Sequence, residues 1–344
     1  MKELIEAINN KRKLGPKKVI ISSTDMCNLN CKMCWRNEKD ENPNIGFKKE
    51  LGFSEIKKIL YDCKKLKVRI IDVTGGGEPF LREDIFELIR LIKSYGFEAT
   101  LTTNATLLDE EKIEALIKLG LDDICFSIES LDKKINDSLR GENSTNKIIN
   151  AVRLFNKIKE RLRRNNPVLR FNTIITNKNY DRLDSLIDFA AKNNIKAINF
   201  SVLIEWDSCR ELSMKNVPWD KAKKILKKLN SRLKRYNVYS NLSSIIKYGL
   251  SSHSLPKFCY APWEILFINS RGEVLPCCIL ASYYTIVVGD IRKNSLEEIW
   301  FGKQMEEFRE KIKGREYFDK CKFCLPEFVE EFNKKYEMMK NEIM

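Results

Sequence analysis

The chain has little of several features that mark particular classes of protein. It has one histidine, His253, and no run of 18 apolar residues, so the sequence predicts no membrane-spanning helix. Its first residues, MKELIE, lack the apolar segment and small-residue cleavage site of a secretory signal. Eleven cysteines in such a chain favour metal ligation over disulfides. We therefore expect a cytoplasmic protein in a reducing, oxygen-poor cell.

The charge is strongly basic. Lysine and arginine number 62 against 48 acidic residues, a net charge of +14, and they crowd the expected helices near 157–164 and 221–235. One interpretation is a basic face for an acidic electron donor, such as a flavodoxin or ferredoxin, or for an anionic substrate. The other is a lysine-rich solvated surface. No nucleic-acid-binding module is recognisable, which disfavours a nucleic-acid partner.

Three cysteines follow the first expected strand at the spacing C-x3-C-x2-C: Cys27, Cys31 and Cys34. Thiolates this close in a loop can converge on one metal centre. Four thiolates would close a zinc site or saturate a four-iron cluster, whereas three leave one iron open to an exogenous ligand. The alternative is a structural zinc loop completed by a distant fourth cysteine.

Strands and helices alternate along the first two thirds of the chain. We expect strands near 18–24, 69–74, 99–103, 123–129, 167–175 and 197–203, with helices between them at about 54–66, 83–95, 109–119, 145–164 and 180–193. Ser54 can cap the first of these helices, and Cys63 falls on its apolar face. This alternation predicts the α/β class, with a parallel sheet curved into a partial (β/α)6 TIM-like barrel.

Polar and glycine-rich residues follow several of these strands, at the carboxyl end where barrels bind their ligands. Gly75, Gly76 and Gly77 allow a backbone to approach a ligand closely, and Glu78 can accept from an ammonium group. Other polar residues at the expected strand ends are Asn104, Ser127 and Glu129.

Together these residues resemble the radical S-adenosylmethionine (SAM) superfamily. The resemblance implies that Cys27, Cys31 and Cys34 hold a [4Fe–4S] cluster whose open iron chelates SAM. One electron then cleaves SAM and releases a 5′-deoxyadenosyl radical. The Gly-Gly-Glu-Pro match implies that Glu78 and the glycine backbone bind the methionyl amino group. The remaining SAM contacts that it implies are Asn104, Ser127, Glu129 and Arg140.

Two residues depart from the superfamily's pattern. Ala105 stands where relatives often have glycine, which puts a tight turn in doubt there. Met33 replaces an aromatic residue that many relatives carry before the third cysteine.

The connector after the sixth strand offers Glu205, Asp207 and Arg210 as candidates for substrate binding or proton removal. An ordinary charged surface loop is the alternative for that connector.

The C-terminal part carries a second cysteine pattern around an expected hairpin at 264–277, followed by an expected helix at 295–312. This pattern resembles the SPASM/twitch extension of radical SAM enzymes, a small α+β iron–sulfur domain. The resemblance implies one auxiliary [4Fe–4S] cluster on Cys259, Cys277, Cys321 and Cys324. Cys278 could replace Cys277, and a four-cysteine zinc site is the alternative. Cys125 and Cys209 fit no pattern and are expected to be buried bystanders.

The whole pattern predicts a radical SAM oxidoreductase that uses SAM and two [4Fe–4S] clusters to oxidise a small polar metabolite. The alternatives are a maturase that modifies a peptide and a non-catalytic zinc scaffold. About 17 residues precede the first strand, which disfavours a leader-binding domain, and the ending Asn341–Met344 lacks the paired glycines of a pterin-precursor cyclase. The expected divisions are a helix at 1–16, the barrel at 17–215, a connector at 216–257, the cluster domain at 258–328 and a helix at 329–344.

Overall fold

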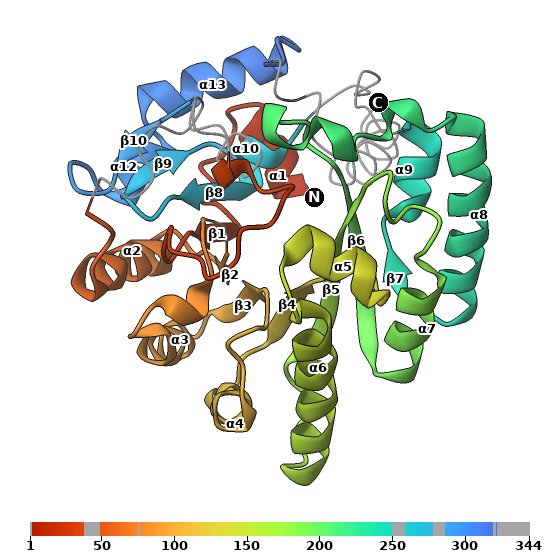
Figure 1. Ribbon diagram of the computed structural model, residues 1–344. Helices are drawn as coiled ribbons and strands as arrows, with labels where there is room; N and C mark the ends of the chain where they lie inside the picture. The colour runs from red at the N-terminus through yellow and green to blue at the C-terminus, as the bar shows by residue number, and fades with distance from the viewer. Residues whose placement is uncertain are drawn as a thin grey trace.

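A single curved sheet organises the computed structural model, which describes residues 2–37, 49–74, 76–249, 259–277, 286–318 and 321 (Figure 1). Within these residues the sheet has ten strands in the order β10-β9-β8-β1-β2-β3-β4-β5-β6-β7. The six central strands are parallel and follow the chain: β1 Lys18–Ile21, β2 Ile70–Val73, β3 Glu98–Thr103, β4 Asp123–Ser127, β5 Val168–Ile175 and β6 Ile195–Val202. The predicted parallel α/β core is therefore confirmed.

Helices cover the convex face of this sheet, with at least one between each pair of successive parallel strands (Figure 1). They are α2 Phe53–Lys65, α3 Ile85–Ser94, α4 Glu110–Leu119, α5 Lys133–Arg140, α6 Ser144–Arg161 and α7 Asp184–Lys192, with α5 and α6 sharing one crossover. After β6 come the short 3-10 helices η3 Asp207–Leu212 and η4 Met214–Asn216, then α8 Trp219–Arg235, β7 Tyr239–Ser240 and α9 Leu242–Tyr248.

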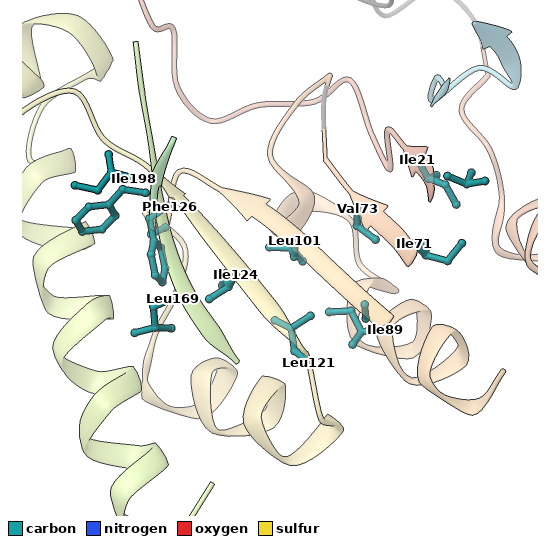
Figure 2. Packing of buried hydrophobic residues seen from close by; sticks show 14 of the residues in the cluster. Ile21, Ile71, Val73, Ile89, Leu101, Leu121, Ile124, Phe126, Leu169 and Ile198 are labelled. Atoms are coloured by element: carbon teal, nitrogen blue, oxygen red, sulfur yellow. The ribbon is translucent and has the colours of Figure 1, made fainter. Parts of the chain in front are cut away.

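Alternation along each strand separates an apolar face from a polar one. Residues such as Ile21, Ile71, Leu101 and Phe126 are fully buried or nearly so beneath the helices, as Figure 2 shows. Burial of each such side chain stabilises the fold by about 1.5–3 kcal/mol. The intervening residues face the concave side and include Lys18, Asp72, Asp123, Arg170 and Asn172. The concave face thus carries many polar groups, and at β1 and in the C-terminal hairpin it also carries a small apolar cluster of Ile20, Ile265, Phe267 and Leu275.

The C-terminal hairpin continues this same sheet. Strand β8 (Ile265–Ile268) pairs parallel with β1, β9 (Glu273–Leu275) is antiparallel to β8, and β10 (Gly289–Asp290) is antiparallel to β9. The N-terminal helix α1 (Lys2–Ile8) packs with α10 (Ala261–Glu264) and α13 (Lys303–Lys313) around Trp263 and Phe308. The two ends of the sequence therefore build one apolar cluster.

Three local predictions differ from the structure. Helix α2 begins after Gly52, whose N–H donates to the Glu55 carboxylate over 2.8 Å, so Ser54 is not the cap. The helix expected over 1–16 ends at Ile8. The helix expected over 295–312 is broken into α12 (Leu296–Trp300) and α13, because Gly302 is extended and lies so close to the Glu298 carbonyl that a Cβ there would be 2.3 Å from its oxygen.

Among the described residues, no helix is long and apolar enough to cross a membrane. The predicted helix at 329–344 and the residues 38–48, Cys278 and His253 lie outside the described part of the chain.

Candidate functional site

The three N-terminal cysteines lie in the loop that leaves the carboxyl end of β1. This loop is fastened on two sides. Asn28 Nδ2 donates to Thr106 Oγ1 over 2.8 Å, and Asn28 Oδ1 accepts from Asn104 Nδ2 over 3.0 Å, both beyond the end of β3. On the other side, the backbone N–H of Lys32 donates to the Leu139 carbonyl of α5 over 2.9 Å. The loop thus bridges the top of β3 and the end of α5.

The thiols of this loop influence one another's charge. Burial raises the pKa of Cys31 to about 11, which the Arg140 guanidinium opposes and the neighbouring Cys34 and Cys27 reinforce. Burial also raises the pKa of Cys34. In the part of the chain that the structure describes, no three His, Cys, Asp or Glu side chains already close on one point as metal ligands do. A bound metal would instead lower the pKa of these thiols, because a coordinating thiol is deprotonated.

The glycine-rich turn after β2 lies directly on the backbone of the cysteine loop. Gly77 N donates to the Thr24 carbonyl and Glu78 N to the Met26 carbonyl, each over 2.7 Å. A Cβ on Gly77 would be only 1.7 Å from the Met26 carbonyl oxygen. Gly76 has φ +59°, a conformation that glycine adopts without strain. From the sequence, we expect these glycines to allow the close approach of a ligand. In the structure, Gly76 and Gly77 are already required because a Cβ on either would overlap residues 22–26. Gly75 lies outside the described residues.

Glu78 fastens this turn to the end of β3. Its side chain is 2% exposed, accepts from Thr103 Oγ1 over 2.6 Å and from the Asn104 N–H over 2.7 Å, and caps the short helix η2 (Pro79–Leu81) by accepting from Phe80 N. Burial raises the pKa of Glu78, and the hydrogen bond from Thr103 opposes that rise. A direct contact between Glu78 and SAM stays a prediction.

The turn after β3 forms even though alanine replaces glycine there. Ala105 has φ +61°, in the left-handed region, and is fully buried. Its N–H donates to Thr103 Oγ1 over 2.9 Å, and the N–H of Thr106 donates to Asn104 Oδ1 over 2.9 Å. Side-chain hydrogen bonds on both sides therefore compensate for the strain of a non-glycine residue.

A buried ion pair lies beside the cysteine loop. Glu129, fully buried after β4, accepts from Arg140 Nη2 and, over 2.5 Å, from the N–H of Ile174 on β5. Arg140 Nη1 lies 4.0 Å from the sulfur of Cys31. Ser127 is half-buried on the concave face, opposite Asn172 of β5. Asn104 and the Glu129–Arg140 pair thus lie beside the cysteine loop.

The charged residues of the connector lie differently. Asp207 and Arg210 pair with each other, and their side chains are about three-quarters exposed (75% and 74%). Glu205 accepts from Ser213 Oγ and Lys215 Nζ within the same connector. These contacts are local, and a substrate or proton-transfer role for the three residues stays a prediction.

The second cysteine group flanks the C-terminal hairpin of β8 and β9. Cys259 and Cys277 pack against the apolar cluster of α1, α10 and α13. Cys321 N donates to the Phe318 carbonyl over 2.8 Å. Burial raises the pKa of Tyr317, and both Cys259 and Cys321 add to that rise, so these two cysteines approach the same tyrosine. Cys324 lies outside the described residues. Cys63, Cys125 and Cys209 are buried as expected.

Some residues of the site were not found from the sequence. Asn28 and Thr106 carry no recognisable pattern. The polar residues of β5 do carry a signal, because Arg170 and Asn172 alternate with the buried Leu169 and Phe171 and so must face the concave side.

Two family models match this chain. The model of the radical SAM superfamily matches residues 21–190, and that of the SPASM iron–sulfur cluster-binding domain matches residues 259–325. The chain belongs to the radical SAM superfamily and carries a C-terminal SPASM region.

The individual relatives are diverse. A probable GTP 3′,8-cyclase of Sulfurisphaera tokodaii is 27% identical over 285 residues, covering 81% of this chain and 86% of the relative. An uncharacterized protein of Methanocaldococcus jannaschii is 30% identical over 280 residues, covering 76% and 85%. The crystal structure of Streptococcus suis SuiB bound to S-adenosylmethionine matches with a TM-score of 0.71 at 19% identity, covering 94% of this chain and 75% of SuiB. The SuiB likeness shows the fold.

Family and SPASM region together imply SAM and two [4Fe–4S] clusters as cofactors. The residues present fit these groups. Cys27, Cys31 and Cys34 are three soft thiol donors on one loop, which suits an iron–sulfur cluster with one open iron. At the second site, the described cysteines Cys259, Cys277 and Cys321 supply donors of the same kind.

Proposed function

We propose that the chain is a radical SAM oxidoreductase that oxidises a small polar metabolite. Cys27, Cys31 and Cys34 would hold the SAM-cleaving cluster, and Cys259, Cys277, Cys321 and Cys324 the auxiliary one. When bound, the first cluster and SAM supply a 5′-deoxyadenosyl radical that takes a hydrogen atom, and the auxiliary cluster supplies an acceptor for the second electron. An acidic redox protein would deliver the initiating electron, in a reducing cytoplasm.

The residues around the loop have defined tasks in this proposal. The backbone of Gly75, Gly76 and Gly77 would bind the amino group of SAM together with Glu78. The N–H groups of Gly77 and Glu78 are fixed against the carbonyls of Thr24 and Met26. The Glu129–Arg140 pair would orient SAM beside Cys31, and Ser127 and Asn104 would contact its remaining polar groups. Since the side chains of Glu78, Asn104, Glu129 and Arg140 are already hydrogen-bonded to the protein, the site would be preorganised for SAM.

The observation that carries the substrate class is the set of polar groups on the concave face of the sheet. Two ion pairs cross it: Lys18 with Asp72, and Arg170 with Asp123, whose oxygens lie 2.6 and 2.7 Å from Arg170 Nε. These four charges cancel. A lumen with paired charges suits a neutral or zwitterionic polar molecule better than a triphosphate, which needs surplus cations.

Above these pairs, the face presents hydrogen-bonding groups. Asn199 Nδ2 of β6 donates to Asn172 Oδ1 of β5 over 3.1 Å, and Asn172 lies opposite Ser127. This row runs from the proposed SAM site across β5 to β6 and remains partly exposed. Amide groups in such a row would bind the hydroxyl, amine or amide groups of a small substrate.

The test is deuterium transfer. Anaerobically reconstituted protein with SAM and dithionite is offered deuterated neutral polyols, aminocyclitols and amino acids, and we expect deuterium in the 5′-deoxyadenosine formed with one of these classes. Deuterium transfer from GTP or from a peptide, with none from the metabolites, would replace this proposal by a cyclase or a maturase. Zinc-loaded protein that leaves SAM intact would refute it altogether.

The same assay separates the two clusters. A Cys259→Ala/Cys277→Ala/Cys321→Ala variant should still cleave SAM but should lose net oxidation of the substrate. Full oxidation by that variant would contradict the role of the auxiliary cluster as electron acceptor.

A further inference from the structure

An apolar cluster lies against one corner of the cysteine loop. We call it the Trp206 cluster, and every member of it is nearly buried, with Trp206 3% and Met33 5% exposed. Cys31 and Trp35 of the cysteine loop pack against it. Its members come from the loop, from α5 and from the connector after β6: Met33, Leu139, Leu203, Trp206, Cys209 and Leu212.

The connector supplies its part through a three-residue repeat. Leu203, Trp206, Cys209 and Leu212 recur at every third position, and the 3-10 helix η3 lies within this stretch. The backbone is kinked at Cys209, where φ is −136°, and the four side chains still reach one common apolar cluster. The intervening Asp207 and Arg210 are exposed. The connector is therefore amphipathic, with its apolar face toward the cysteine loop.

Hydrogen bonds hold the connector in this position. The N–H of Asn177, after β5, donates to the Leu212 carbonyl over 3.1 Å, and Asn177 Nδ2 donates to the Glu211 carbonyl over 2.7 Å. At the other edge, Leu139 accepts from the N–H of Lys32 in the cysteine loop. Both sides of the Trp206 cluster are thus fixed by backbone contacts.

We propose that the Trp206 cluster is an apolar cover that excludes water and dioxygen from the Cys31 corner of the SAM-cleaving cluster and keeps its reduction potential low. The proposal rests on the assignment of Cys31 as a cluster ligand. Trp206 is a positioning residue here, because it belongs to the apolar cluster that packs against Cys31.

The electrostatic reason is the charge of the site. A [4Fe–4S]2+ cluster with three thiolates carries a net charge of −1, and one-electron reduction takes it to −2. A surrounding of low dielectric constant disfavours the more highly charged form, whereas water stabilises it. Removal of the indole should therefore make the potential less negative.

The experiment compares Trp206→Ala with Trp206→Phe and with Ser208→Ala, a substitution at an exposed position of the same helix. Dithionite titration follows the electron paramagnetic resonance signal that changes when SAM is added, because that signal reports the SAM-cleaving cluster. Exposure to air follows loss of the iron–sulfur absorbance. We expect Trp206→Ala to shift the potential to less negative values and to bleach severalfold faster, while Trp206→Phe and Ser208→Ala stay close to the unmodified protein.

Unchanged potential and bleaching rate in a folded Trp206→Ala protein would overturn the proposal. Should that variant fail to fold, Leu212→Ala removes a smaller part of the same cover, and the same two readouts apply to it. If the unmodified protein shows no signal that responds to SAM, the assignment of Cys31 fails, and this proposal fails with it. A normal signal with unchanged potentials in the variants refutes the cover alone.

Discussion

Replacement of Gly77 by alanine adds one methyl group at the tightest contact of the site. The new Cβ would be 1.7 Å from the carbonyl oxygen of Met26, 2.4 Å from its carbonyl carbon and 2.8 Å from the carbonyl carbon of Asp25. Because all three are backbone atoms, no side-chain rotation relieves the overlap. The glycine turn and the cysteine loop must separate until the shortest contact reaches about 3.0 Å, a displacement of more than about 1 Å.

This separation breaks the two hydrogen bonds that join the turn to the loop, from Gly77 to Thr24 and from Glu78 to Met26. At about 0.5–1.5 kcal/mol each, their loss amounts to about 1–3 kcal/mol. The displaced backbone leads directly into Cys27, so the cluster and SAM would be misplaced relative to each other. A misplacement of about 1 Å can slow a reaction about 100-fold.

The assays are iron content and the rate of 5′-deoxyadenosine formation with SAM and dithionite. We expect Gly77→Ala to lose up to about four of about eight irons, or to keep them and cleave SAM about 100-fold more slowly. Gly52→Ala is the matched control, because Gly52 has φ −75° and no atom within 3.7 Å of a new Cβ. Full iron content with an unchanged cleavage rate in Gly77→Ala would refute the reasoning.

Three further predictions concern the clusters, the turn and pH. Alanine at all three cysteines of the N-terminal loop should leave about four irons per chain, and complete loss of iron would contradict two separate cluster sites. Glu78→Ala leaves a buried hydroxyl and a buried N–H without their acceptor, at about 1–3 kcal/mol each in chemical unfolding, and should weaken SAM binding in equilibrium dialysis. Normal SAM affinity would exclude a role for Glu78. The hydrogen bond from the backbone N–H of Gly52, and to a smaller extent Arg292, lowers the pKa of Glu55 in the folded state. Ionised Glu55 therefore stabilises the fold above its unfolded pKa. This stabilisation is lost as the pH falls through the folded pKa. Glu55→Gln should therefore destabilise the protein at pH 7 and less at pH 4, and an equal effect at both values would refute this assignment.

Much of the site follows from motifs in single stretches of sequence. The spacing of Cys27, Cys31 and Cys34 and the Gly-Gly-Glu-Pro turn identify the superfamily because both depend on residues close together in the chain. The alternation of strands and helices predicts the parallel sheet, and parallel strands bring their carboxyl ends to one edge. The place of Asn104 and Glu129 beside the loop follows from that rule.

Contacts between distant segments were not predictable in this way. The connector offered Glu205, Asp207 and Arg210 as charged candidates, whereas the structure turns Trp206 and Cys209 toward the cysteine loop. An apolar residue at every third position of the connector does not reveal by itself which other segment it packs against. That becomes visible only when the cysteine loop is placed beside it. Likewise, Ala105 departs from the glycine of relatives, and only the hydrogen bonds around it show why its positive φ is tolerated.

The sequence by itself determined the chemistry available to this protein: which thiols lie close enough along the chain to share a cluster, and which strands alternate with helices. Tertiary structure decided how that chemistry is enclosed. The hairpin of β8 and β9 joins the barrel sheet through β1, α1 packs against α13, and the connector covers the cysteine loop. The physical reason is that residue spacing is a local property, whereas burial depends on segments that meet only after the whole sheet has formed.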